Sequence, residues 1–149
     1  MVNEVETYVE VLKGHDLKVT QQRLEILRYL EEHRTHPTAD EIYKALIKKY
    51  PSLSKTTVYN TLEILCDAGI IDQLTICPTE HRYDFHHQAH HHFFCKQCGK
   101  IIDINFPCTN VETIKKDILK NGHQIDDVHG YFKGICSSCI KKREKQDGY

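Results

Sequence analysis

Apolar residues recur at helical spacing in four stretches of the first half of the chain. The first stretch extends from Val5 to Leu12 and runs into Gly14. The second follows Thr20, which is a suitable N-cap, and ends near His33. The pattern predicts two amphipathic helices in this part of the chain.

The third and fourth stretches carry clear helix-start signals. Thr38 and Glu41 have the three-residue spacing of a capping box, and the helix that they open should end before Pro51. Ser54 is the expected N-cap of the fourth helix, and Gly69 is its expected terminator. The sequence therefore predicts a third and a fourth helix between these signals.

The fourth predicted helix has two different faces. An apolar stripe is formed by Val58, Leu62 and Leu65, and a polar but hardly charged face is formed by Thr56, Tyr59, Asn60 and Glu63. Hydroxyls, an amide and a phenol near a helix N-terminus can donate to phosphates and base edges. On an isolated helix we would interpret this face as ordinary solvated surface.

The neighbours of this helix favour nucleic-acid recognition instead. Residues 70–76 and 81–85 have the pattern of two short strands, and Pro78 lies in the turn between them. Helices followed by such a hairpin are typical of a winged helix-turn-helix, which commonly reads the major groove of DNA.

The rest of the chain is typical of a small α/β domain. Phe93 and Phe94 are typical of a strand that leads to Cys95, and residues 100–105 have the pattern of a second strand. Thr109 and Glu112 form another capping box, which predicts a helix.

Two short strands are expected on either side of Gly130, and residues 141–149 form a charged tail that we expect to be frayed. Together the elements predict an α+β fold. A winged helix-turn-helix domain would occupy residues 1–83, and a small α/β domain would occupy residues 84–149.

Composition adds a constraint on how DNA would be bound. The chain has 149 residues, of which 28% are charged and 40% hydrophobic, as in a soluble globular protein. Residues 1–83 carry ten basic and thirteen acidic side chains, and the remainder carries ten and eight. Because neither part is strongly basic, DNA binding must depend on locally placed groups rather than on bulk charge.

The beginning of the chain bears on its compartment. Glu4, Glu6 and Glu10 stand where a signal peptide would need basic residues and an apolar run, and no stretch is apolar enough to cross a bilayer. We therefore expect a cytoplasmic protein with no membrane partner. Structural disulfides are the weaker interpretation of its cysteines in that reducing compartment.

Four cysteines stand in two identical brackets that are separated by 37 residues. Cys95 and Cys98 form the first, and Cys136 and Cys139 form the second. Two such turns can supply the four thiolates of a closed tetrahedral site, so we expect a structural zinc ion. The other cysteines are interpreted as small buried residues or, where exposed, as redox-active thiols: Cys66, Cys77 and Cys108.

Histidines are concentrated just before the first bracket. His90 and His92 would project from one face of a strand, where they can chelate one ion. The carboxylates of Asp84 and Asp103 lie close enough in the sequence to join them. Such mixed ligands suit iron(II), manganese(II) or zinc(II), whereas the alternative is a solvated histidine tract.

Several motifs in a fixed order resemble the ferric uptake regulator superfamily, over nearly the whole chain. They are Thr20-Gln-Gln-Arg23, His36-Pro-Thr-Ala-Asp-Glu-Ile-Tyr43, Thr57-Val-Tyr-Asn60, the run from His90 to His92, and Cys95-x-x-Cys98-Gly-Lys. The resemblance implies a homodimeric, metal-dependent DNA-binding repressor, with an N-terminal winged helix and a C-terminal α/β dimerisation domain.

Within the superfamily the chain looks most like the peroxide-sensing PerR branch. That resemblance implies a regulatory iron or manganese ion with five ligands, which fall on His36, Asp84, His90, His92 and Asp103. Iron-uptake members usually carry glutamate at the position of Asp103, so its aspartate favours the peroxide branch.

The resemblance also implies how the two domains would work together. An ion ligated from both domains would hold the two DNA-reading helices of a dimer on a palindromic operator. Peroxide reacting with bound iron(II) would oxidise His36 or His90 and release the DNA. The expected DNA-contacting residues are Arg23, Lys55, Thr56, Thr57, Tyr59 and Asn60.

Other functions are open at this point. An iron- or zinc-uptake regulator would release DNA on metal removal alone, without a response to peroxide. A non-haem iron enzyme could use a similar histidine and aspartate cluster, but it would leave the polar face of the fourth helix without a purpose. A zinc-stapled adaptor would bind protein and no operator. We expect a regulator and not an enzyme.

Overall fold

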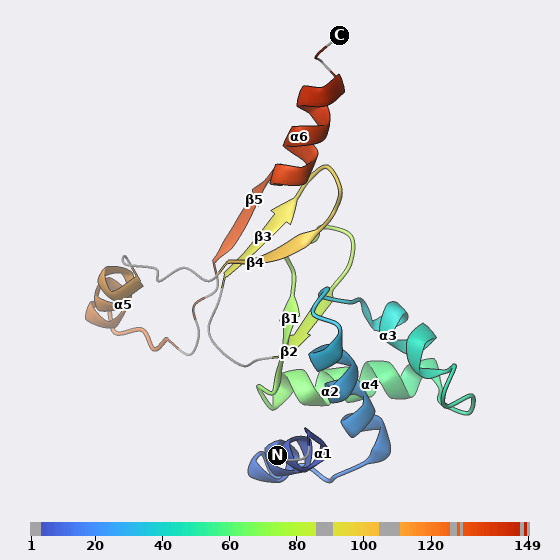
Figure 1. Cartoon of the computed structure of the whole chain (residues 1–149). Coiled ribbons are helices and arrows are strands. Elements are labelled where there is room, and N and C mark those ends of the chain that lie inside the picture. Colours follow the sequence, from blue (N-terminus) through green and yellow to red (C-terminus); the bar gives the residue numbers. More distant parts are fainter. Residues whose placement is uncertain are drawn as a thin grey trace. The chain divides into compact units, whose positions relative to one another are not determined.

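The computed structural model describes residues 4–85, 91–104, 111–125, 128, 130–146 and 148. The chain divides into two compact units, Met1–His87 and Gln88–Tyr149. Figure 1 labels their helices and strands. No helix within the described ranges has both the length and the apolar character needed to cross a membrane.

The described part of the first unit contains four helices and a hairpin. The helices are α1 (Glu4–Gly14), α2 (Gln21–Glu32), α3 (Ala39–Leu46) and α4 (Lys55–Asp67). The hydroxyls of Thr20, Thr38 and Ser54 each accept a hydrogen bond from the backbone N–H three residues later. The complete capping box of Thr38 and Glu41 is present. The predicted starts of these helices are therefore confirmed.

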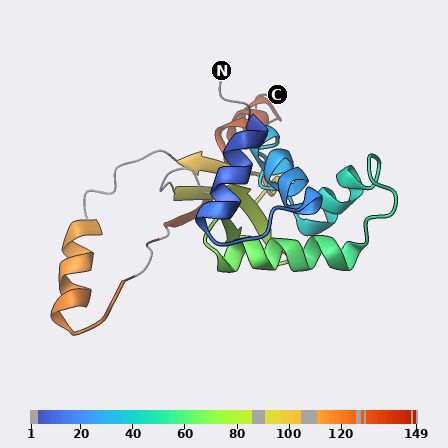
Figure 2. The ribbon, with the colours of Figure 1, turned by 90° about the horizontal axis from the view of Figure 1, so that it is seen from below.

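The core of the first unit forms around α4. Helices α2 and α3 contact α4, and α1 contacts α2 (Figure 2). Val58, Leu62 and Leu65 on α4 are each 0% exposed, which confirms the predicted apolar stripe. They share one core with Leu27 of α2 and Ile42 of α3. The opposite face of α4 remains available to solvent.

The predicted wing is a two-stranded antiparallel hairpin. It consists of β1 (Ile71–Leu74) and β2 (Arg82–Phe85), with Leu74 opposite Arg82. Leu74 and Phe85 are buried. The sequence-based domain boundary between residues 83 and 84 falls inside strand β2. The whole of β2 lies within the first compact unit, which extends to His87.

The second unit is built on a three-stranded sheet. Its strands are β3 (His91–Cys95), β4 (Ile101–Ile104) and β5 (Tyr131–Gly134), in the order β4-β3-β5. Strand β3 pairs antiparallel with β4 and parallel with β5. Helix α5 (Val111–Lys120) ends just before Gly122, which has a φ of +81°.

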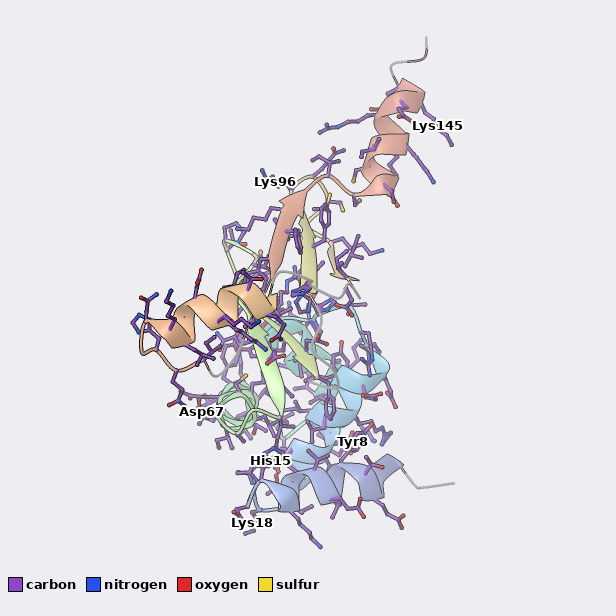
Figure 3. All side chains as sticks on the ribbon, turned by 90° about the vertical axis from the view of Figure 1, so that its left-hand side faces the viewer. Tyr8, His15, Lys18, Asp67, Lys96 and Lys145 are labelled. Carbon is purple, nitrogen blue, oxygen red and sulfur yellow. The ribbon has the colours of Figure 1, made fainter. Side chains whose placement is uncertain are left out.

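The prediction of a frayed charged tail from residue 141 is wrong. Helix α6 covers Ser137–Gln146, and Lys145, labelled in Figure 3, lies in its last turn. The turn of the second bracket starts the helix, because Cys139 and Ile140 both donate their N–H to the Cys136 carbonyl at 3.0 Å. Lysine, arginine, glutamate and glutamine have high helix propensity, so the segment can be helical without an apolar stripe.

Some expectations for this unit receive no support or fall outside the described residues. No strand precedes β5 in the described residues 121–125 and 128, although one was expected before Gly130. Thr109 of the second capping box, Cys108 and His90 lie outside the described residues.

Candidate metal and DNA-binding sites

The four bracket cysteines of the second unit form one cluster. The sulfurs of Cys95 and Cys139 are 3.9 Å apart, and those of Cys98 and Cys136 are 3.8 Å apart. All four sulfurs lie within 4.8 Å of one another, and the four thiols are free. In a tetrahedral zinc site with Zn–S bonds of about 2.3 Å, the sulfurs are separated by about 3.8 Å. The cluster therefore has the size that a four-thiolate zinc site requires.

Backbone geometry prepares the first bracket for a thiolate. Strand β3 ends at Cys95, and Gly99, at a φ of +73°, donates its N–H to the Cys95 carbonyl at 2.8 Å. Glycine adopts this left-handed conformation without steric cost. Lys96, labelled in Figure 3, lies within the bracket. From the second bracket, the N–H of Cys136 donates to the Cys95 sulfur at 3.3 Å.

The electrostatics of the cluster favour a bound cation. Hydrogen bonds from the backbone N–H groups of Cys98 and Cys136 lower the pKa of the Cys95 thiol to about 6. The side-chain contact with Cys136 raises the pKa of the Cys139 thiol to about 12. One thiolate is thus stabilised, but four thiolates would repel one another at this spacing. A dication offsets that repulsion, so the donor set fits zinc.

A histidine and an aspartate of the second unit face each other across two strands. His92 of β3 and Asp103 of β4 are register partners in the antiparallel pair. The His92 Nε2 and Asp103 Oδ1 atoms are 3.4 Å apart, and the His92 side chain is 0% exposed. Because the register places both side chains on one face of the sheet, the pair is set by the strand pairing itself.

The first unit contains a second pair of the same chemistry. His36 lies just before α3, and Asp84 lies in β2. The His36 Nε2 and Asp84 Oδ2 atoms are 3.9 Å apart, and both side chains are buried. His36 has a φ of +55°, which places a non-glycine residue in the left-handed region. An imidazole and a carboxylate are thus held together at a strained position.

Each pair is close enough to chelate one divalent ion. Two metal–ligand bonds of about 2.1 Å can span up to about 4.2 Å between donor atoms, and both measured separations are shorter. Imidazole nitrogen with carboxylate oxygen suits iron(II), manganese(II) and zinc(II).

The polar face predicted on α4 is exposed. Thr56, Tyr59 and Asn60 are accessible, and the Tyr59 side chain is 45% exposed. Thr57 differs, because it is half-buried and its hydroxyl lies 2.7 Å from that of Ser54. Its N–H also donates to Ser54 at 3.1 Å. Thr57 therefore takes part in capping α4.

A carboxylate from α3 holds the lysine at the start of α4. The Lys55 ammonium is 2.9 Å from Asp40, which also contacts Lys44 at 2.8 Å. Hydrogen bonds from Lys44 and Lys55 lower the pKa of Asp40 to about 2. The Lys55 nitrogen also lies 5.9 Å from the centre of the Tyr59 ring. Asp40 was missed in the sequence, where only its i,i+4 spacing to Lys44 is visible.

Arg23 is tied to its own segment. It is half-buried in the first turn of α2, and its N–H donates to the Thr20 hydroxyl at 3.4 Å. Its guanidinium donates to the Lys18 carbonyl. These bonds orient the arginine at the N-terminus of α2, and its contact with DNA stays a prediction.

Two further cysteines of the first unit differ in their chemistry. Burial raises the pKa of the Cys66 thiol to about 12, whereas a hydrogen bond with the Thr79 hydroxyl lowers the pKa of the Cys77 thiol. Cys66 lies in α4, and Cys77 lies in the turn of the wing. Cys66 is therefore expected to react slowly with thiol reagents at neutral pH.

The sequence is similar to that of known regulators along most of its length. The profile of the ferric uptake regulator family matches residues 14–132. The chain is 38% identical, over 143 residues, to the peroxide-responsive repressor PerR of Staphylococcus aureus, and the match covers 94% of each protein.

Solved structures show the same likeness in three dimensions. The Campylobacter jejuni peroxide stress regulator superposes with a TM-score of 0.70 and 32% identity, over 88% of this chain and 98% of that one. The Helicobacter pylori ferric uptake regulator, described with three functional metal-binding sites, superposes with a TM-score of 0.72 and 25% identity. That match covers 93% of this chain and 95% of the other.

Proposed function

The chain belongs to the ferric uptake regulator family, whose members are metal-responsive transcriptional repressors, and from this premise we propose that it is a peroxide-sensing repressor. It binds operator DNA when a regulatory iron(II) or manganese(II) ion is bound. Hydrogen peroxide releases it from DNA when the ion is iron. The support comes from the likeness to PerR together with the donor sets of the two units.

A structural zinc ion is the first part of the proposal. Its ligands are Cys95, Cys98, Cys136 and Cys139, whose sulfur separations match a tetrahedral site. With four protein ligands the site is closed, so it stabilises the second unit and leaves no open position for exchange chemistry.

The regulatory ion is the second part. We assign it to the His36 and Asp84 pair together with His92 and Asp103, and to His90 by resemblance. Each pair alone would bind a divalent ion weakly, because it offers two donors. Joining two chelating pairs on one ion multiplies their affinities through the high effective concentration of the second pair. The ion then links the DNA-reading unit to the second unit.

DNA recognition is assigned to the exposed face of α4. Its hydroxyl, phenol and amide groups are suited to hydrogen bonds with phosphates and base edges, and the helix N-terminus adds partial positive charge. The proposed contacts are Lys55, Thr56, Tyr59 and Asn60 on this face, Thr57 in the first turn of α4, and Arg23 at the start of α2. Because the chain is not basic overall, these local groups would carry the interaction.

Homodimerisation is assigned to the second unit. Strand β5 lies at an edge of its sheet, and Tyr131 and Phe132 on it are 37% and 50% exposed. Ile114 and Leu119 of α5 are also exposed. Exposed apolar side chains that gather into one patch mark protein-interaction surfaces, which is the role proposed for these residues. A two-fold dimer would place two α4 helices on two half-sites, which is why the proposed operator is palindromic.

Peroxide sensing depends on ligand loss. Bound iron(II) supplies the chemistry that reduces hydrogen peroxide; in the net reaction one oxygen atom enters an imidazole ring and the peroxide leaves as water. The proposed targets are His36 and His90. An oxidised His36 is a poorer ligand, so the link between the units weakens. If the ion favours the DNA-binding form by about 4 kcal/mol, its loss changes the population ratio about a thousandfold.

A mass measurement tests this function. The iron(II)-loaded protein is treated with peroxide, and its peptides are searched for one added oxygen on His36 or His90; the manganese(II)-loaded protein is the control. We expect the oxygen in the iron sample alone, together with loss of operator binding. Release on metal removal without any oxidised histidine would instead identify a metal-uptake regulator, which the likeness to the Helicobacter pylori protein also suits.

Asp103 is the residue that we propose distinguishes a peroxide-sensing repressor from a metal-uptake regulator. Replacing Asp103 by glutamate keeps an oxygen ligand but lengthens its side chain by one methylene. We expect Asp103→Glu to retain metal-dependent operator binding and to release DNA far more slowly on peroxide treatment in a gel-shift assay. Unchanged peroxide release would contradict the role given to this residue.

A further inference from the structure

Strand β2 holds the segment around His36 through three neighbouring residues. The Arg82 guanidinium Nη1 donates to the His36 carbonyl at 3.3 Å. The N–H of Tyr83 donates to the Pro37 carbonyl at 3.0 Å. Asp84 then approaches the His36 imidazole at 3.9 Å. Consecutive residues of one strand thus contact both the backbone and the side chain of the same short segment.

The backbone of His36 needs such support. Its φ of +55° lies in the left-handed region, which is unfavourable for a residue with a Cβ atom. A strained residue keeps this conformation only where its surroundings over-determine it. The carbonyl of His36 is the group that its rotation would move, and Arg82 binds that carbonyl directly.

The guanidinium is itself held in place. Its Nη2 atom is 2.7 Å from the Glu80 carboxylate, and its Nη1 atom is 3.8 Å from that of Glu41. Glu41 in turn accepts the N–H of Thr38 at 2.8 Å in the capping box of α3. The Arg82 side chain is only 20% exposed. Arginine suits this position because its planar fork presents several donors in fixed directions.

We propose that Arg82 is a positioning residue for the regulatory ion: by binding the His36 carbonyl, it holds the His36 imidazole beside the Asp84 carboxylate before the ion arrives. Arg82 and Asp84 are two apart on β2, so their side chains leave the same face of the strand. Arg82 does not bind the metal. The inference rests on the proposed function, in which His36 and Asp84 are ligands.

The size of the effect follows from the conformational cost. Without the guanidinium, residue 36 can leave the left-handed region, and only a fraction of molecules would present both ligands together. If that fraction falls to about a tenth, the apparent Kd for the ion rises about tenfold. A purely structural role in the wing would lower stability without this specific loss of metal affinity.

The test uses the full-length, zinc-loaded protein and manganese(II) as the probe, titrated calorimetrically. We expect about tenfold weaker binding for Arg82→Met, an intermediate value for Arg82→Lys, which keeps one donor, and a value within about twofold of the unchanged protein for Glu80→Gln. Glu80→Gln is the matched control, because it removes the charge of the ion pair with Arg82 but keeps an amide oxygen that can accept from Arg82 Nη2, and it leaves the contact with His36 in place.

A second measurement needs no regulatory ion. In the zinc-loaded protein without manganese(II), the Cα and Cβ chemical shifts of residue 36 report whether its backbone is left-handed. We expect them to move toward an ordinary extended conformation in Arg82→Met and to remain in Glu80→Gln. This readout separates positioning from general stabilisation of the wing, which would leave the torsion of residue 36 unchanged.

A double-mutant cycle distinguishes the failure of this inference from the failure of the proposed function. In a His36→Ala background, Arg82→Met should cause no further loss of manganese affinity. If His36→Ala alone binds manganese normally, the ligand assignment is wrong. If His36→Ala weakens binding while Arg82→Met binds normally with unchanged shifts at residue 36, the positioning role of Arg82 is overturned and the ligand assignment stands.

Discussion

Removing one thiolate of the cysteine cluster should unfold the second unit and leave the first unit folded. The change is Cys136→Ala, which removes one proposed zinc ligand, adds no new donor and keeps the backbone N–H that donates to the Cys95 sulfur. Cys136 is buried beside Cys95 and Cys139 in the core of the second unit. The partly buried apolar residues packed against these cysteines are Phe93, Ile102 and Ile135.

The magnitude follows from how little else this core contains. A unit of about 60 residues has a stability of roughly 3–9 kcal/mol at typical values per residue. A structural zinc site contributes on the order of 10–16 kcal/mol of apparent binding free energy in small zinc domains. Metal binding would therefore supply more than the net stability of the unit. The first unit has its own apolar core and does not depend on the cluster.

Zinc content and backbone amide NMR spectra measure the two effects separately. We expect the zinc affinity of Cys136→Ala, in competition with a chelator, to fall by more than about a hundredfold, because even changes to groups that merely orient ligands cost 10–100-fold. Amide signals of residues 91–104 and 130–146 should lose their dispersion, while those of residues 20–85 keep it. Cys77→Ser is the matched control, since that cysteine lies in the wing turn.

A retained equivalent of tightly bound zinc in Cys136→Ala, with dispersed signals in both units, would refute the four-thiolate assignment. Loss of dispersion in both units at once would refute a different step, namely the independence of the first core. Loss of zinc with a folded second unit would show that its apolar contacts suffice without the ion.

Three further outcomes test the first unit. Asp40→Asn removes the carboxylate that holds Lys55 at the start of α4, so operator affinity should rise and the slope of log K against log salt should steepen by about 1. Asp67→Asn makes the same charge change at the other end of α4 and should give a smaller change. Leu62→Ala should lower the free energy of unfolding by about 2–5 kcal/mol in urea titrations, because the side chain is 0% exposed, and a loss below 1 kcal/mol would contradict its place in the core. At pH 8, iodoacetamide should modify Cys77 well before Cys66, because the pKa of Cys77 is lowered and that of Cys66 is raised to about 12; equal rates would argue against these environments.

Local signals in the sequence predict the first unit well. Capping hydroxyls, terminating glycines and one apolar stripe are properties of consecutive residues, and Thr38 with Glu41 behaves as its spacing indicates. Helix α6 was missed because its prediction relied on apolar periodicity. Its helicity comes from propensity and from the turn at Cys136, and neither produces a periodic pattern.

The pairs in the candidate sites could be predicted only in part. His92 and Asp103 lie on strands joined by the first bracket, so the turn sets the register that brings them together. The contact between Lys55 and Asp40 joins two helices, and no spacing rule connects residues fifteen positions apart. The strained backbone of His36 depends on β2, whose place beside it is a product of the whole fold.

The two histidine–aspartate pairs have different origins, and this has a consequence for the proposed sensor. The pair on β3 and β4 is held by the pairing of two strands in one sheet, and the hydrogen bonds of that pairing join backbone groups rather than side chains. The pair at His36 depends on a strained residue and on side-chain contacts from β2. Under the proposed function, the ion therefore binds one ligand pair that strand pairing holds in place and a second pair that requires an unfavourable backbone conformation at His36. Oxidation of His36 would break a metal bond and weaken the ring's contact with Asp84, which is one of the contacts around the strained backbone. His36 is therefore the position where one oxidised ring would have the largest effect on the link between the units.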